Sequence, residues 1–196
     1  MSAAEPQSVP PQNSAVTWKR VARRIRVPLS FCFAALYLWL ARPAWEWMAA
    51  GAVLIAAGLA LRAAASGHVR KNAELTTTGP YRYTRNPLYL GSLLVGFGFA
   101  VAARSWWVVV SMAVLFVAIY WPVILAEEEF LRAQFSGFDD YARRVPRLLP
   151  TLRPAGNTGS FSRTLYWQHR EYNALIGALA MLIALTAKMW WRMSGR

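Results

Sequence analysis

Residues 79–91 read GPYRYTRNPLYLG, and here a polar turn leads directly into an apolar helix. Gly79 and Pro80 are typical of a turn, and Pro87 suits a first helical turn, where no N–H is needed. Asn86, just before that proline, is expected to be the N-cap residue. The stretch therefore predicts a helix that begins at Pro87 and presents free backbone N–H groups, which suit an anion.

Three consecutive acids, Glu127, Glu128 and Glu129, follow the uncharged run 106–126. Acids are poorly matched to the negative dipole end of a helix, so the helix is expected to continue beyond them. Glu127 then shares a face with Tyr120, whereas Glu128 is rotated by about 100°. At least one acid is expected to turn inward, and a solvated acidic turn is the alternative.

The composition is that of a membrane protein. Hydrophobic residues make up 56% of the chain, against about 45–50% in soluble domains. Apolar runs that approach the length of a membrane span occur at residues 27–41, 44–61, Pro87–Ala103, 106–126 and 172–187. The predicted fold is therefore all-α, a polytopic membrane protein with about five transmembrane helices.

Only Arg104 and Ser105 separate the third apolar run from the fourth. So tight a connection predicts an antiparallel hairpin that returns both polar clusters to the same membrane face. Polar groups gathered where helices leave a bilayer are costly to desolvate unless they bind something. The hairpin therefore predicts one candidate site to which both clusters contribute.

Cationic residues are concentrated on one side of the predicted helices. The segments 19–26, 62–85 and 132–170 hold 17 of the 22 Lys and Arg residues. By the positive-inside rule, the N-terminus and both polar clusters face the cytoplasm. The charge predicts contact with anionic lipid headgroups and not with nucleic acid. The basic stretch 141–150, which is part of the last of these segments, either lies on the headgroups or folds over the site as a lid.

The remaining sequence predicts a single domain without a metal site. Residues 1–17 are rich in Ser, Pro, Gln and Ala and are expected to be a disordered tail, and residues 18–196 form a single membrane domain. Cys32 is the single cysteine, so no intramolecular disulfide is expected. His68 and His169 are far apart and have no cysteine partners, so a metal site is not expected.

Together, the two polar clusters resemble the signatures of the integral membrane methyltransferases that include isoprenylcysteine carboxyl methyltransferases and phospholipid methyltransferases. The first signature, G-x-Y-x-x-x-R-H-P-x-Y-x-G with Asn86 at the histidine, is matched by Gly79, Tyr81, Arg85, Pro87, Tyr89 and Gly91. The second, E-E-x-x-L-x-x-x-F followed by Tyr and V-P, is matched by Glu127, Glu128, Leu131, Phe135, Tyr141, Val145 and Pro146. The resemblance covers residues 75–150 and leaves residues 172–191 as an additional C-terminal transmembrane helix.

This resemblance implies methyl transfer from S-adenosylmethionine to a lipid-like or prenylated acceptor, of the isoprenylcysteine carboxyl type, from a pocket on the cytoplasmic side. It implies cofactor contacts from Leu75, Thr76, Tyr81, Asn86, Pro87, Leu88 and Tyr89. It also implies catalytic roles for Glu127, which lies near the acceptor, for Glu128, which supports it, and for Arg85. The expected partners are membrane lipids and a lipophilic or lipid-modified acceptor.

The sequence does not identify the methyl acceptor. Prenylcysteine enzymes look to carry an arginine one turn before the first glutamate, where this chain has Val123. A carboxylate, an amine and a thiol are therefore all candidate acceptors. The alternative functions are a membrane reductase that uses a nicotinamide cofactor and a non-catalytic membrane scaffold or transporter subunit. A transporter is expected to carry polar groups near mid-membrane, and the third and fourth apolar runs carry no charge.

Overall fold

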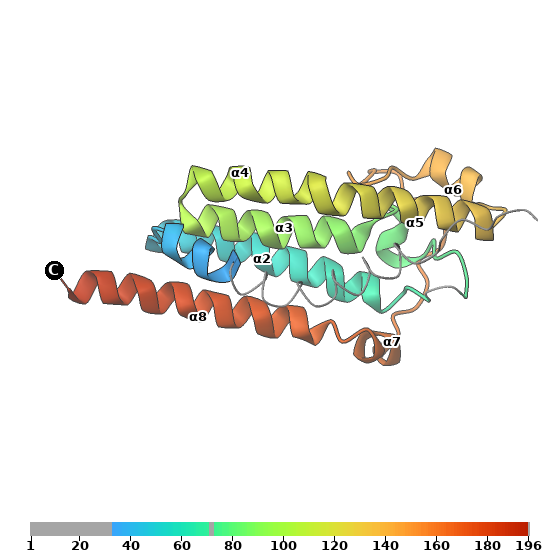
Figure 1. Ribbon diagram of the computed structural model, residues 1–196. Coiled ribbons are helices and arrows are strands. Elements are labelled where there is room, and N and C mark those ends of the chain that lie inside the picture. Colours follow the sequence, from blue (N-terminus) through green and yellow to red (C-terminus); the bar gives the residue numbers. More distant parts are fainter. Residues whose placement is uncertain (1–32, 71–72, 196) are drawn as a thin grey trace, which may run out of the picture. The chain divides into compact units, whose positions relative to one another are not determined.

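The computed structural model describes residues 33–70 and 73–195, and every regular element in these ranges is helical (Figure 1). The chain divides into two compact units, one ending at Trp39 and the other beginning at Leu40. In the first unit, residues 33–39 are helical. The predicted tail 1–17, the first part of the predicted run 27–41 and Cys32 lie outside the described residues. All that follows concerns the second unit.

The second unit consists of helices joined by short turns and by two longer connections, residues 67–78 and 145–162. In chain order, they are α2 (Trp45–Ser66), the 3₁₀ turn η1 (Gly79–Arg82), α3 (Pro87–Ala103), α4 (Trp106–Leu115), the π-helical stretch η2 (Phe116–Tyr120), α5 (Trp121–Gln134), α6 (Phe138–Arg144), α7 (Arg163–Gln168) and α8 (Tyr172–Ser194).

Three of the described helices are long and apolar enough to cross a membrane: α2, the continuous helix Trp106–Gln134 and α8. The predicted helix Pro87–Ala103 is confirmed to the residue as α3, which is shorter at 17 residues. The all-helical prediction is thus confirmed for the described residues, whereas the number of about five spans stays a prediction.

Glycines bring α2 and α3 into close antiparallel contact. A Cβ atom on Gly51 would lie 2.5 Å from the carbonyl oxygen of Gly98, and one on Gly58 would lie 2.6 Å from that of Gly91. Any larger residue at these positions would push the two helix backbones apart. The pairing fixes the start of α3 beside the last turns of α2.

The helix that carries the three acids accommodates an internal proline. Pro122 cannot donate a backbone hydrogen bond and its ring crowds the preceding turn. The π-helical stretch Phe116–Tyr120 lies directly before α5, which contains that proline, and such wider turns occur where a regular helical ladder is interrupted. The helix then continues to Gln134, which confirms the prediction that it runs past the acids.

The two polar clusters meet at one end of this unit. Asn86, at the start of α3, donates from Nδ2 to Oε1 of Glu128 on α5 at 3.3 Å. At the opposite end, the backbone N–H of Arg42 donates to the carbonyl of Ala103 at 2.8 Å. The predicted hairpin and the juxtaposition of the clusters are therefore confirmed. That this end faces the cytoplasm stays a prediction.

Candidate functional site

The segment 145–158, here called the strap, runs back along the turn that precedes α3. Four backbone hydrogen bonds of 2.9–3.0 Å join the two segments: Arg85 N to Pro146 O, Thr151 N to Tyr83 O, Ala155 N to Arg82 O, and Gly79 N to Thr158 O. The basic stretch 141–150 therefore contacts the first signature through Pro146, and its contact with lipid headgroups stays a prediction.

A small hydrophobic cluster anchors the strap. Phe138, Tyr141 and Val145 are buried together, and Leu75 packs against them. The hydroxyl of Tyr141 donates to the carbonyl of Tyr81 at 2.7 Å, and burial raises the pKa of that hydroxyl above its usual range. Leu75, which the resemblance assigns to the cofactor pocket, therefore contributes to the hydrophobic support of the site.

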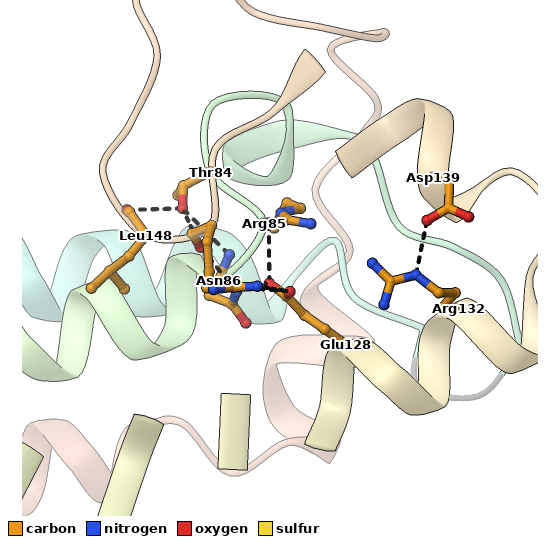
Figure 2. A network of polar contacts seen from close by, with 8 residues as sticks. Thr84, Arg85, Asn86, Glu128, Arg132, Asp139 and Leu148 are labelled. Atoms are coloured by element: carbon orange, nitrogen blue, oxygen red, sulfur yellow. Dashed lines mark hydrogen bonds and ion pairs between the residues drawn. The ribbon is translucent and has the colours of Figure 1, made fainter. Parts of the chain in front are cut away.

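Glu128 is the centre of a buried polar network (Figure 2). Its side chain comes from α5, and the residue is only 4% exposed. The Arg147 guanidinium contacts both carboxylate oxygens at 2.9–3.1 Å, and Nη2 of Arg85 lies 3.4 Å from Oε1. A carboxylate is stable in such surroundings only when it is paired and hydrogen-bonded. Glu128 is therefore the acid that turns inward, as predicted for at least one of them.

Asn86 occupies the N-cap position of α3, but its side chain makes no capping hydrogen bond. Instead, Nδ2 donates to Glu128 and, at 2.9 Å, to the carbonyl of Arg147. The neighbouring Thr84 hydroxyl donates to the carbonyl of Leu148 at 2.9 Å (Figure 2). The prediction that Asn86 is the N-cap residue is confirmed, and its side-chain amide holds the strap and α5.

Arg85 does not share a helix face with Tyr89. The helix begins at Pro87, so Arg85 lies before it and its side chain turns toward Glu128. The guanidinium also lies 5.8 Å from the ring centroid of Phe138. Burial lowers the pKa of this guanidinium, and the negative charge of Glu128 opposes that shift. Arg85 and Tyr89 therefore contact different acids, Glu128 and Glu127 respectively.

Tyr89 contacts the other acid. Its hydroxyl donates to Oε2 of Glu127 at 2.9 Å, and its ring meets the ring of Tyr120 edge to face at a centroid distance of 5.8 Å. Glu127 is exposed, in contrast to Glu128. Because Glu127 and Tyr120 both contact Tyr89, the prediction that they share a face is confirmed. This group places an accessible carboxylate beside two aromatic rings.

The remaining predicted contacts lie around the same turn. Tyr81 is 8% exposed, and burial raises the pKa of its hydroxyl, with the negative charges of Glu127 and Glu171 adding to the shift. Pro87 is buried, and Thr76 is half-buried, with its hydroxyl accepting from the N–H of Arg70 at 3.3 Å. Tyr81 is thus within electrostatic reach of two carboxylates from different helices.

Sequence reasoning missed an ion pair next to this turn. Arg62, near the end of α2, makes hydrogen bonds of 2.8–3.0 Å with both carboxylate oxygens of Glu171, which caps α8. Arg62 also donates to the carbonyl of Leu88 at 3.4 Å and to the hydroxyl of Ser92. The two charged residues lie 109 positions apart. The available signal was an arginine at the edge of an otherwise apolar run.

Comparison with known proteins matches residues 47–137 to the model of the phospholipid methyltransferase family, and this segment contains both polar clusters. The predicted resemblance is thereby confirmed for that segment. The nickel-cobalt-cadmium resistance protein NccN of Alcaligenes xylosoxydans xylosoxydans is 40% identical over 83 residues, which cover 42% of this chain and 39% of that protein. The cobalt-zinc-cadmium resistance protein CzcN of Cupriavidus metallidurans is 41% identical over 83 residues, or 42% and 38% of the two chains.

The matched stretch spans less than two fifths of each of these relatives. No solved structure matches the chain significantly.

Proposed function

From the match of residues 47–137 to the model of the phospholipid methyltransferase family, we infer that the protein transfers a methyl group from S-adenosylmethionine to a lipid-like or lipid-modified acceptor in the membrane. The observation that carries this proposal is the contact between Tyr89 and Glu127, which joins the first signature to the second at 2.9 Å. Methyl transfer requires that the groups that bind the donor lie next to the groups that bind the acceptor.

The side chains around Glu127 fit a sulfonium donor. A positively charged sulfur is attracted both by a carboxylate and by the faces of aromatic rings, and Tyr89 and Tyr120 lie next to this acid. The first-turn N–H groups of α3 have no partner within the helix and suit the carboxylate of an amino acid. When bound, S-adenosylmethionine supplies the electrophilic methyl group.

Glu127 acts on the acceptor. If the acceptor is an amine or a thiol, the carboxylate takes its proton, and a general base of this kind contributes about 10²–10⁴-fold to the rate. If the acceptor is already an ionised carboxylate, no base is required. The hydroxyl of Tyr89 donates to Oε2 of Glu127 and fixes the direction of the carboxylate.

The buried network around Glu128 holds this arrangement in place. It joins α5, the start of α3 and the strap through Asn86 and Arg147. Alignment of two reactants and exclusion of water lower a barrier by about 7–11 kcal/mol in favourable cases. In this proposal, Glu128 and Arg85 position the catalytic groups and do not contact the transferred methyl group.

Val123 on α5 bears on the chemical class of the acceptor. Val123, at the position where prenylcysteine enzymes look to carry an arginine, is 46% exposed. Because no cation stands there, an amine or another lipid-linked group fits better than a prenylcysteine carboxylate. The cation distribution supports a site at the cytoplasmic face, where the water-soluble donor is available.

The direct test is a methyl-transfer assay with purified protein in detergent. Labelled S-adenosylmethionine is incubated with lipid extracts, and the labelled product is identified. Because two relatives carry the names of metal-resistance proteins, extracts from cells grown with and without cobalt or cadmium are compared. No labelled product, together with binding of reduced nicotinamide dinucleotide in place of S-adenosylhomocysteine, would identify the protein as a reductase.

A single variant tests the donor site. Tyr89→Ala removes the ring and the hydroxyl beside Glu127, so we expect S-adenosylmethionine, whose sulfur is positively charged, to bind at least about tenfold more weakly. Isothermal titration in detergent measures this affinity. The apparent affinity for the acceptor should change less. An unchanged affinity for S-adenosylmethionine would exclude Tyr89 from the donor site.

A further inference from the structure

A cavity of about 210 Å³ lies beside the Arg62–Glu171 ion pair. The side chains that line it, apart from this pair, are Leu59, Ala60, Ala63, Tyr166 and Leu175. The wall is thus largely apolar, with one carboxylate and one guanidinium set into it. A charged group in such a wall is well placed to hold the charged end of a ligand whose remainder is aliphatic.

Arg62 has no hydrogen-bonding capacity left for a ligand. Its Nε and Nη2 donate to Glu171, and its Nη1 donates to the carbonyl of Leu88 and the hydroxyl of Ser92. A guanidinium has five N–H donors, and these contacts use all of them. Arg62 therefore acts as a positioning residue that fixes the Glu171 carboxylate.

Glu171 retains acceptor capacity. A carboxylate offers about four lone-pair sites, and Arg62 occupies three of them through the hydrogen bonds given above. The Glu171 side chain is only 11% exposed, so water reaches it poorly. An acceptor with little access to water is best satisfied by a strong donor, and a primary ammonium group is the donor that also carries the opposite charge.

This carboxylate lies near the groups assigned to the methyl donor. Through Arg62 it is linked to the carbonyl of Leu88 in the first turn of α3. Its charge, like that of Glu127, also contributes to the raised pKa of Tyr81. The ion pair therefore borders the first turn of α3, which holds Tyr89, on the side of α2 and α8.

We propose that Glu171, positioned by Arg62, binds the α-ammonium group of the amino-acid end of the methyl donor. This assignment rests on the proposed use of S-adenosylmethionine. The donor's methylene chain then contacts the apolar side chains of α2 and α8 that line the cavity. Binding of the donor thus joins the C-terminal helix, which lies beyond the matched family segment, to the site.

The test compares two ligands that differ only in the amino-acid end. S-adenosylhomocysteine carries the ammonium group, whereas 5′-methylthioadenosine lacks the entire amino acid. In Glu171→Gln, the amide oxygen still accepts from Arg62, so α8 stays in place. We expect S-adenosylhomocysteine to bind at least about tenfold more weakly, as for the loss of a charged hydrogen bond. The affinity for 5′-methylthioadenosine should be unchanged.

Two control variants separate recognition from support of the fold. Glu74→Gln removes an exposed acid that pairs with Arg70 at 3.7 Å, and it should leave both affinities unchanged. The exchange Arg62→Glu with Glu171→Arg restores an ion pair between α2 and α8 but puts a cation beside the cavity. It should recover thermal stability without recovering the affinity for S-adenosylhomocysteine.

Several outcomes would overturn the assignment. Equal losses of affinity for both ligands in Glu171→Gln would show a purely structural ion pair, and no loss for either ligand would exclude contact with the donor. A raised KM for the acceptor with unchanged S-adenosylhomocysteine binding would assign Glu171 to an acceptor amine instead. Failure of the wild-type protein to bind S-adenosylhomocysteine would overturn the proposed function itself.

Discussion

Glu127 and Glu128 are consecutive residues of one helix, yet their surroundings have little in common. Glu128 is 4% exposed and is held by Arg147, Arg85 and Asn86, whereas Glu127 is exposed and contacts Tyr89. A rotation of about 100° per residue is enough to produce this difference. The comparison teaches that one acid holds the signatures together, while its neighbour remains accessible for chemistry.

The two acids also differ in what their removal leaves behind. Without Glu128, two guanidinium groups lose their counter-charge in a buried region, and an uncompensated buried charge is costly. Without Glu127, one tyrosine hydroxyl turns to water at little cost. Stability and turnover should therefore respond to different members of the same pair.

The largest effect is expected for Glu128→Gln. Loss of the negative charge leaves Arg85 and Arg147 unpaired, and removal of one partner of a buried ion pair lowers the free energy of unfolding by about 3–5 kcal/mol. Thermal unfolding in detergent, followed by circular dichroism, measures the change. Glu129→Gln is the matched control, because that acid is exposed and its loss should leave the melting temperature unchanged. Equal melting temperatures for the two variants would contradict the burial of the Glu128 charge.

A smaller effect is expected for Arg147→Gln. This variant removes the hydrogen bonds from the strap to Glu128, but Arg85 and Asn86 still satisfy the carboxylate. The Arg147 side chain is also 36% exposed, so part of its contribution is screened by water. We expect a loss of about 1–3 kcal/mol, typical of a hydrogen bond to a charged group.

Limited proteolysis gives a second measurement for Arg147→Gln, because a loosened strap should be cut first within residues 145–158. A loss as large as that of Glu128→Gln would mean that Arg85 contributes nothing to the pairing.

Part of this arrangement was predictable from the sequence because it depends on local signals. Pro87 fixes the start of α3, and the short connection at Arg104 and Ser105 forces the hairpin that brings Asn86 to Glu128. The identity of the inward-facing acid was not predictable. It depends on Arg147, which reaches Glu128 only because the strap folds back along the turn.

The Arg62–Glu171 pair was missed for the same reason. The contact joins residues 109 positions apart, so no local spacing indicates it. Sequence reasoning therefore finds elements whose ends are marked by proline, glycine and charge. It does not find the long-range pairings that decide which side chain is buried.

The smallest effect on stability, and the sharpest test of the comparison, is expected for Glu127→Gln. The amide still accepts from the hydroxyl of Tyr89, so the fold and the melting temperature should be unchanged. Turnover should fall at least about tenfold, which corresponds to about 1.4 kcal/mol in the barrier, because the variant has lost the general base. Initial rates with saturating donor measure the change, and Glu129→Gln again serves as the control. Wild-type turnover in a folded Glu127→Gln protein would leave Glu127 without a chemical role, and the division of labour between the two acids would then be wrong.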